Sequence, residues 1–308
     1  MARAKTAQAQ FYLQLSTLGM FLNQQCDRIC NFFANINMVL DKIVIFDTTM
    51  RDGELTPGVS MNLQQKISIA TLLEAIGIDV IEVGYPGRYG KDFQEIFEIA
   101  KIIENSIVCG LASSNKAEII SVAEAIKPAT RGRINVFTSV NLHSKLYEQT
   151  LSEINASVSL ARNYCEDVQW TAFDATGSEP DFLCNAIEVA INSGATTITI
   201  PDSLGLAKSE EFLQLLETIF HRVPNIDKAT VAVHCHDDLG MAVDNSIIGL
   251  SCGVGQIECS INGLGARKGN ADLAKIVERI SEIYQVNIDT SLISQASELV
   301  TQITGITH

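Results

Sequence analysis

The sequence predicts an α/β protein folded as a (β/α)8 barrel, and three observations lead to this fold class. From Lys42 onward, short apolar runs alternate strictly with longer helical patterns. The alternation gives eight β-then-α units in roughly 240 residues, which is the size of such a barrel. No glycine fingerprint follows the first apolar run, so a doubly wound open sheet is only the second choice.

Eight runs rich in apolar and β-branched residues are expected to be the strands of a parallel sheet. They span residues 43–46, 79–83, 107–111, 133–138, 167–171, 196–200, 230–234 and 256–261. Between them lie segments whose apolar residues recur as on one face of a helix. These helical segments span 62–76, 91–104, 115–126, 149–164, 181–193, 208–222, 241–252 and 270–284. We therefore expect a TIM-barrel domain over residues 41–286.

The two ends of the chain differ from this repeating region. Residues 1–40 carry no acidic residue before Asp27 and include a mixed apolar stretch at 11–22. We interpret them as a non-catalytic N-terminal extension, because a targeting peptide would be expected to show a clear small-residue cleavage site. Residues 287–308 are predicted to be a short helical linker, read as one helix from Ile288.

Composition and charge exclude several classes of protein. The chain of 308 residues is 46% hydrophobic, yet no apolar run is long enough to span a membrane. Its net charge of −14 and its pI near 4.8 exclude a nucleic-acid partner from the expected functions. The eight cysteines follow no disulfide spacing, which indicates a reduced, cytoplasmic setting. Cys26 and Cys30 lie on a predicted helix and are interpreted as structural.

A pair of histidines near the C-terminal end of the seventh strand is the most specific candidate site. His234 and His236 lie in Val-Ala-Val-His-Cys-His-Asp-Asp-Leu-Gly, which predicts a strand running into a loop. Residues two apart in a strand leave the same face, so the imidazoles should converge while Cys235 points away. With a carboxylate or amide oxygen they could bind one divalent cation. For this motif alone, two histidines that are merely hydrogen-bonded at a strand end remain an equal alternative.

Polar residues also follow most of the other predicted strands. Barrel enzymes place their chemistry at the C-terminal ends of the strands. The residues found there are Arg51, Asp52, Glu82, Asn135, Phe137, Ser139, Thr171, Phe173, Asp174, Asp202, Ser203, His234, His236 and Asn270. Any one of them fits an ordinary loop residue, but the joint pattern predicts an active site at this rim.

Three segments resemble the signatures of the 2-isopropylmalate, homocitrate and citramalate synthase family. They are Phe46–Glu54, His234–Ser246 and Gly263–Asn270, in the family's order. The resemblance extends over about residues 42–284 and is closest to the isopropylmalate branch. It implies a metal-dependent barrel enzyme that joins acetyl-CoA to a 2-oxoacid and produces a 2-substituted malate.

Carried over residue by residue, the resemblance implies a metal site and an oxyanion-stabilising group. The ligands would be Asp52, His234 and His236, with Asn270 as a fourth ligand or just outside the ligand shell. Such a site suits Mg²⁺, Mn²⁺ or Zn²⁺ without deciding among them. Arg51 would stabilise the alkoxide that forms on carbon–carbon bond formation. Its alternative role is a salt bridge at the barrel mouth.

The resemblance also implies how the substrates are bound. Ser203 stands where the family usually has threonine and would hydrogen-bond the substrate carboxylate. In the last loop, Gly265, Lys268 and Gly269 would meet the phosphates of coenzyme A. The alternative for this loop is a tight strand-to-helix turn.

Besides Ser203, four positions depart from the family pattern. Ala266 and Phe173 replace glutamates, Asn135 replaces a histidine, and Leu55 replaces a glutamine. Losing two carboxylates predicts an apolar acceptor pocket, suited to an aromatic 2-oxoacid such as phenylpyruvate, which would give benzylmalate. A paralogue that has lost activity is the alternative.

Relatives of this family continue beyond the barrel into a subdomain whose histidine acts across a dimer. We expect a homodimer on this ground. The general base is left unassigned, since it could come from elsewhere in the chain, from a water, or from a portion of the gene beyond this sequence. Three hypotheses follow from the sequence. They are an acyltransferase of the synthase type, a metal-dependent lyase or aldolase of the same barrel family, and a non-catalytic paralogue that binds metal or 2-oxoacid. The strand-8 loop favours the first, since the related lyases carry a cysteine there.

Overall fold

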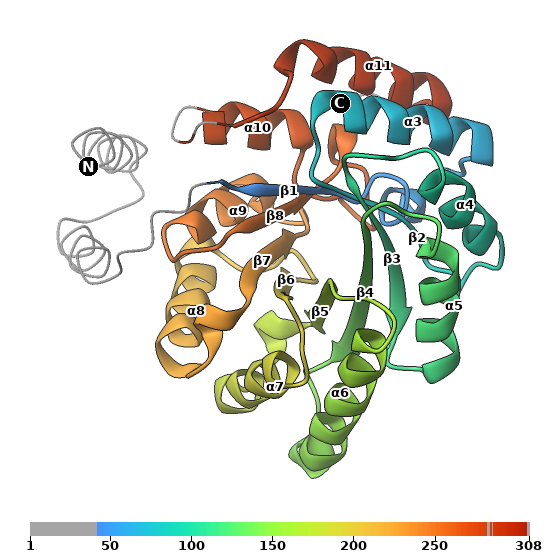
Figure 1. Cartoon of the computed structure of the whole chain (residues 1–308). Coiled ribbons are helices and arrows are strands. Elements are labelled where there is room, and N and C mark those ends of the chain that lie inside the picture. Colours follow the sequence, from blue (N-terminus) through green and yellow to red (C-terminus); the bar gives the residue numbers. More distant parts are fainter. Residues whose placement is uncertain (1–41, 282–283, 285, 307–308) are drawn as a thin grey trace.

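The predicted apolar runs form eight parallel strands that close into a barrel (Figure 1). The computed structural model describes residues 42–281, 284 and 286–306 of the chain. The strands are β1 (Val44–Asp47), β2 (Val80–Gly84), β3 (Ile107–Ser113), β4 (Gly132–Ser139), β5 (Val168–Phe173), β6 (Thr197–Asp202), β7 (Thr230–Cys235) and β8 (Gln256–Cys259). Because β1 pairs with both β2 and β8, the (β/α)8 fold is confirmed and the open sheet is excluded.

The predicted helical segments form a ring outside the strands (Figure 1). They are α3 (Leu63–Ile76), α4 (Lys91–Ala100), α5 (Lys116–Ile126), α6 (Tyr147–Arg162), α7 (Pro180–Asn192), α8 (Ser209–Arg222), α9 (Ala242–Leu250) and α10 (Leu273–Ser281). Local sequence sets their ends, as α3 illustrates. Asn62 and Gln65 form a capping box at its start, and Gly77 ends it in the left-handed conformation with φ 94°.

The C-terminal helix, α11 (Ile293–Thr304), begins later than predicted. The Asp289 side chain accepts hydrogen bonds from the amide and hydroxyl of Ser291, and this stabilises a 3-10 turn at Thr290–Leu292 instead of a helix from Ile288. In the structure α11 packs against α3 (Figure 1). It also packs against the 3-10 turn η5 (Ile261–Gly263) that follows β8. It therefore lies on the barrel, beside the loop that leads to Asn270.

Two predictions about the ends of the chain fall outside what the structure can address. The N-terminal extension at 1–40, with Cys26 and Cys30, lies outside the described residues. The division into an extension, a barrel and a linker at 287–308 stays a prediction. Among the described helices, none combines the length and the apolar character needed to cross a membrane.

The main hydrophobic core lies between the strands and the surrounding helices. Trp170 on β5 belongs to it, with no exposed surface, and its indole Nε1 donates to Thr138 Oγ1 at 3.1 Å. It is the single tryptophan of the chain. Its neighbours Gln169 and Thr171 point to the opposite face of the strand, into the barrel.

The interior of the barrel is divided into an apolar and a polar half. Apart from Glu82 at the rim, the inward side chains of β1 to β3 form a small separate apolar cluster of Phe46, Val80, Ile107 and Cys109. On β4, β5, β6 and β8, buried inward side chains are polar and hydrogen-bonded to one another: Arg133, Gln169, Thr199, Gln256 and Glu258. This polar half leads directly to the histidine pair at the end of β7.

Candidate metal centre and active site

Asp52, His234 and His236 come together at the C-terminal rim of the barrel, as predicted. One ligand atom from each lies within 4.8 Å of the others, and all three side chains are buried. Asp52 reaches the site because the chain turns tightly after β1. There the carbonyl of Thr48 accepts hydrogen bonds from the amides of Arg51, Asp52 and Gly53 at 2.9–3.1 Å.

Hydrogen bonds at Nδ1 orient both imidazoles. His234 Nδ1 lies 3.0 Å from Glu258 Oε2, and His236 Nδ1 donates to the carbonyl of Gly269 at 3.2 Å. The ring centroids are 5.0 Å apart, so the two rings converge. Cys235 is buried on the other face of the strand, and burial raises the pKa of its thiol well above the ordinary range. The predicted arrangement of these three residues is confirmed.

Asn270 lies against Asp52. Its Nδ2 donates to Asp52 Oδ2 at 2.8 Å and to the carbonyl of Leu264 at 2.9 Å. Its Oδ1 is buried, and among the described residues it has no hydrogen-bond partner. Buried polar atoms are rarely left without a hydrogen-bond partner, and one reason for such an atom is that it serves as a metal ligand. One carboxylate, two imidazoles and an unpartnered amide oxygen are a donor set that fits a divalent cation.

The charges around the site favour the protonation states that a metal requires at Asp52 and His236, but not at His234. Burial lowers the pKa of His234, but the hydrogen bond and the charge of Glu258 outweigh it, and the pKa is raised above its usual value. Burial alone would raise the pKa of Asp52, but Arg51 and then the two histidines outweigh it, and the pKa falls well below its usual value. Burial, followed by the charge of His234, lowers the pKa of His236 to about 4. At neutral pH the carboxyl is therefore ionised and the His236 imidazole is neutral. Metal ligands must be deprotonated in this way.

Arg51 is held between two carboxylates. Its Nε lies 2.6 Å from Glu82 Oε2, and its Nη1 lies 2.6 Å from Asp52 Oδ1. Glu82 also accepts hydrogen bonds from Thr48 Oγ1 at 2.7 Å and from Asn135 Nδ2 at 3.1 Å. The sequence placed Glu82 at the rim without a role, although a single carboxylate in the otherwise apolar β2 was the signal. It connects Arg51 to Asn135.

A pocket of about 380 Å³ opens above these residues. Every residue predicted to bind the acceptor lines it: Arg51, Asn135, Phe173, Ser203 and Ala266. Asp52, His234 and His236 line it as well. Three of the four predicted metal ligands therefore share a single pocket with the acceptor contacts, and Asn270 lies behind Asp52 outside its lining.

One wall of this pocket is aromatic. Phe137 meets Tyr85 edge to face at a centroid distance of 5.8 Å and lies 6.2 Å from Phe173. Leu111 of β3 adds a further apolar side chain to the lining. The sequence places Phe137 and Phe173 at this rim but predicts an acceptor contact for Phe173 alone, and it predicts no role for Tyr85 or Leu111. Their position depends on strand register, which a single sequence does not reveal.

The remaining predictions concern Ser203, which was predicted to bind the acceptor carboxylate, and the loop after β8, which was predicted to bind coenzyme A. Ser203 Oγ accepts a hydrogen bond from the amide of Asp174 at 2.9 Å, which leaves its hydroxyl proton able to donate. In the loop after β8, the amide of Gly265 donates to Thr56 Oγ1 at 2.8 Å and that of Gly269 donates to the carbonyl of Ala266 at 2.9 Å. Both amides are thus used within the protein, whereas the side chain of Lys268 is exposed.

A second group of acids, Glu54, Asp92 and Glu95, has the spacing of a metal site but contains a built-in cation. The fully buried Lys66 places Nζ 2.8 Å from Glu54 Oε2 and 2.7 Å from Glu95 Oε2. Its Nζ also donates to the carbonyl of Val83 at 3.1 Å. This ammonium group stabilises the acids, so the cluster is structural.

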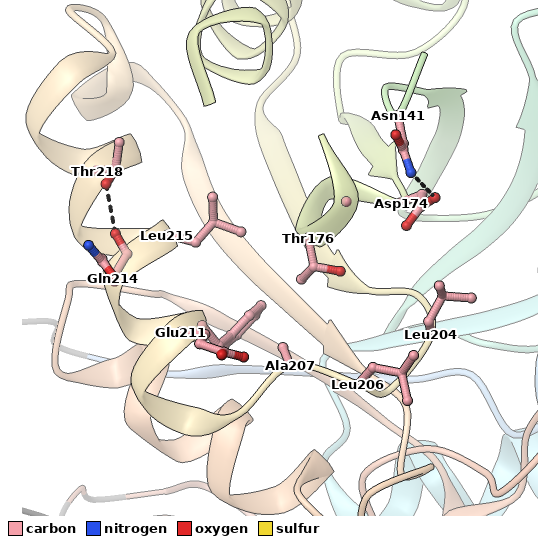
Figure 2. A pocket seen from close by; sticks show the side chains of 12 residues that line it. Asn141, Asp174, Thr176, Leu204, Leu206, Ala207, Glu211, Gln214, Leu215 and Thr218 are labelled. Atoms are coloured by element: carbon pink, nitrogen blue, oxygen red, sulfur yellow. Dashed lines mark hydrogen bonds between the residues drawn. The ribbon is translucent and has the colours of Figure 1, made fainter. Parts of the chain in front are cut away.

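A second pocket of about 470 Å³ lies between α8 and the loops after β4, β5 and β6 (Figure 2). Figure 2 shows Gln214, Leu215 and Thr218 of α8 on one side, and the Asn141–Asp174 hydrogen bond on the other. Its lining contains no histidine and no basic residue. Although this pocket is larger, neither cluster of potential metal ligands among the described residues lines it, and the smaller pocket with Asp52, His234 and His236 is the candidate active site.

Comparison with protein families and relatives is consistent with this site. The family model described as HMGL-like matches residues 42–300. A 2-isopropylmalate synthase of Rhodopseudomonas palustris (strain HaA2) is 46% identical over 280 residues. That match covers 86% of this chain and 53% of the relative, so the chain spans about half the length of the relative.

Solved structures share the barrel at low sequence identity. An HMG-CoA lyase from Brucella melitensis gives a TM-score of 0.73 at 18% identity, covering 86% of this chain and 100% of that chain. An HMG-CoA lyase from Acinetobacter baumannii, in complex with coenzyme A and 3-methylmalate, gives 0.74 at 18% identity and covers 88% and 94%. At such identities the likeness establishes the fold alone.

Proposed function

Because the chain belongs to the HMGL-like family, we propose that it is a 2-isopropylmalate-synthase-like acyltransferase. The methyl carbon of acetyl-CoA loses a proton and bonds to the ketone carbon of a 2-oxoacid. Water then releases coenzyme A from the thioester, and a 2-substituted malate remains. The observation that carries this proposal is the Asp52–His234–His236 cluster within the candidate pocket. The 46% identity to a synthase supports it.

Asp52, His234 and His236 are proposed to hold Mg²⁺, Mn²⁺ or Zn²⁺, and the unpartnered Oδ1 of Asn270 is the candidate fourth donor. When bound, such a cation supplies a Lewis acid for the ketone carbonyl. Arg51 supplies a fixed positive charge beside the same oxygen as it becomes an alkoxide. The ion pair with Glu82 keeps the guanidinium of Arg51 in place.

The acceptor carboxylate is proposed to bind Ser203, whose hydroxyl lines the pocket. Asn135 fixes the other side of the site through Glu82 and through Thr171, whose Oγ1 donates to Asn135 Oδ1 at 2.9 Å. Acetyl-CoA is proposed to approach across the loop 263–270. There Lys268, with an exposed side chain, is available for a phosphate, while the predicted contacts of Gly265 and Gly269 require their amides to change partners. A homodimer in the cytoplasm remains part of the proposal.

The acceptor side chain is proposed to be apolar and aromatic, as in phenylpyruvate, which would give benzylmalate. Tyr85, Phe137 and Phe173 offer ring faces and edges, and rings in such geometry attract by about 0.5–1.5 kcal/mol beyond area burial. Ala266 also lines the pocket, and its small side chain leaves more space for the acceptor than the glutamate usual in the family would leave. Each methylene buried against such a wall is worth about 0.8 kcal/mol.

The test is release of free thiol from acetyl-CoA with a panel of 2-oxoacids, after chelation and after addition of Mn²⁺. We expect metal-dependent release with catalytic efficiency rising from pyruvate through 2-oxoisovalerate to phenylpyruvate or 4-methyl-2-oxopentanoate, since one methylene gives about 10–200-fold discrimination. His236→Ala should abolish it, whereas His221→Ala, exposed on α8, should not.

Other outcomes identify the competing functions. Cleavage of a 2-substituted malyl thioester without condensation would indicate a lyase, and binding of a 2-oxoacid without thiol release would indicate a non-catalytic paralogue. Preference for 2-oxoglutarate would point to Arg88 at the pocket wall and against the apolar wall. The double variant Phe173→Glu with Ala266→Glu should shift preference toward 2-oxoisovalerate.

A further inference from the structure

Among the described residues, Glu258 on β8 is the only one whose carboxylate lies within hydrogen-bonding distance of a ring nitrogen of His234 or His236. It is buried, and its Oε2 lies 3.0 Å from His234 Nδ1. Its other oxygen, Oε1, accepts from Gln169 Nε2 at 2.9 Å and Thr199 Oγ1 at 2.8 Å, with Gln256 Nε2 at 3.4 Å. The carboxylate is therefore fixed at one end by donors and faces His234 with the other.

The direction of these hydrogen bonds is determined by Arg133, a residue that can only donate. Its Nη1 lies 3.0 Å from Gln169 Oε1 and 2.8 Å from Gln256 Oε1, and its Nε pairs with Asp167 Oδ2 at 3.0 Å. Since guanidinium requires acceptors, both glutamines must present oxygen to it. Their NH₂ groups then face Glu258, and the orientation of each amide follows from chemistry.

We propose that the line Arg133–Gln169–Glu258 sets the tautomer of His234, which makes Glu258 and Gln169 positioning residues of the metal site. The Glu258 carboxylate only accepts, so neutral His234 carries its proton on Nδ1. The lone pair of Nε2 is then available to a cation. A ligating histidine is generally oriented by such a partner on its other nitrogen.

The proposal rests on the metal site of the proposed function, but not on the acceptor or on acetyl-CoA. It makes a specific statement about Glu258→Gln, a change that keeps the shape. The NH₂ group of Gln169 requires an oxygen on its side, because two buried donors that face each other are unfavourable, whereas the hydroxyl of Thr199 can donate or accept. The new NH₂ group must therefore face His234. His234 then accepts at Nδ1 and carries its proton on Nε2, where the cation would bind.

The exchange Glu258→Gln with Gln169→Glu reverses this effect. The carboxylate now on β5 would accept from Arg133 and Gln256, and it would also accept from the NH₂ group of the amide now on β8. The oxygen of that amide then returns to His234, and the Nδ1–H tautomer is restored. Net charge and side-chain size are unchanged between the exchanged protein and the original.

The experiment combines ¹⁵N NMR of histidine-labelled, metal-free protein at alkaline pH with Mn²⁺ titration followed by electron paramagnetic resonance. We expect Nδ1–H at His234 in the original protein, and Nε2–H in Glu258→Gln. Mn²⁺ affinity should fall by on the order of 10–100-fold in Glu258→Gln, as for other partners of metal-bound histidines. The double exchange should restore Nδ1–H and most of the affinity.

Glu74→Gln, the same substitution at a carboxylate that accepts amides of residues 104–106, is the matched control and should leave Mn²⁺ affinity unchanged. Nε2–H at His234 in the original protein would overturn the proposal whatever the variants do. So would Nδ1–H in Glu258→Gln, or a folded double exchange that stays as weak as the single variant. If the original protein failed to bind Mn²⁺, the proposed function would fail instead, and the NMR result would still decide the tautomer.

Discussion

At the scale of single residues, Arg51, the predicted catalytic group, is held by two carboxylates. Its guanidinium contacts Glu82 and Asp52 at 2.6 Å each, and only 16% of its side chain is exposed. The sequence allows two roles for Arg51, stabilisation of the alkoxide or a salt bridge at the mouth of the barrel. The structure contains the salt bridges, and these are what would hold the guanidinium ready for a developing charge.

Arg51→Lys is therefore expected to lower kcat by on the order of 10²-fold, as loss of one preorganised donor does. An ammonium group cannot reproduce the planar fork that contacts two carboxylates at once. The measurement is kcat and KM for the best 2-oxoacid. Arg279→Lys, at a partly exposed pair with Asp244, is the matched control. An unchanged kcat with a raised KM would instead assign Arg51 to ground-state binding.

Asp47 at the end of β1 is a buried carboxyl group outside the metal site. Burial raises its pKa to about 7, against the opposing hydrogen bonds from Thr49. The folded protein thus keeps a proton that the unfolded chain releases near its ordinary pKa of 3.8. Because the folded state binds more protons in this interval, this residue makes the free energy of unfolding decrease as pH rises from about 4 to about 7.

Asp47→Asn should remove this dependence, since the amide is neutral and can still pair with Thr49. Urea unfolding at pH 5 and pH 8 should show the variant gaining on the original protein by on the order of a few kcal/mol at the higher pH. Asp227→Asn, on the surface, should change neither value. If the two proteins follow parallel pH profiles, Asp47 is already ionised in the fold.

The site residues that could be predicted from the sequence are those that lie within short, recognisable sequence motifs. His234, His236 and Asp52 stand in short recognisable segments, so their convergence was predicted and is confirmed by the geometry. Glu258 and Glu82 were harder to assign, because an isolated glutamate in a strand gives no sign of which residue on another strand it faces. That information lies in the register between β7 and β8, where His234 pairs with Glu258.

At the scale of elements, α11 and the turn η5 form the main unexpected contact. Asn262 Nδ2 donates to the carbonyl of Ser297 at 3.2 Å and to Thr301 Oγ1 at 3.0 Å, and Ser297 Oγ donates back to Asn262 Oδ1 at 2.6 Å. Asn262 adopts φ 56°, a left-handed conformation that asparagine tolerates better than most residues. The C-terminal helix is thereby tied to the loop that ends at Asn270.

Asn262→Gly should release α11 while keeping the backbone of the turn, because glycine adopts positive φ freely. Losing these hydrogen bonds, at about 1 kcal/mol each, should speed amide exchange in α11 by about 10-fold or more. Hydrogen exchange measured by mass spectrometry reports this directly. Thr304→Ala removes a hydrogen bond within α11 and one from the amide of Ile306 just after it, but none to η5, and serves as control. Equal exchange in both variants would mean that apolar packing alone holds the helix.

The sequence predicted the elements better than their ends. Strand and helix ranges were close because apolar periodicity fixes which residues are buried. The start of α11 was wrong because the Asp289 side chain competes for backbone amides, and apolar spacing does not register such a competition. The contact of α11 with η5 depends on distant segments of the chain and could not be predicted from periodicity.

At the scale of the whole molecule, the alternation of strands and helices was sufficient to predict the barrel. It was not sufficient to predict that the interior would be apolar on one side and polar on the other. A run of alternating residues shows which side chains share a face, but not which strands close the ring beside them. The aromatic wall arises in the same way, because Tyr85 follows β2, Phe137 lies on β4 and Phe173 ends β5, and the barrel brings these positions together.

The single tryptophan gives the barrel an optical signal of its own. Trp170 is buried on the outer face of β5 with its indole N–H on Thr138, and it does not line the active-site pocket. We expect emission at short wavelength from the folded protein and a red shift on unfolding. Mn²⁺ or a 2-oxoacid should leave the emission unchanged, and so should Glu258→Gln and Arg51→Lys. One fluorescence spectrum per variant would then separate a damaged site from a lost fold, and a shift on ligand binding would show that β5 itself moves.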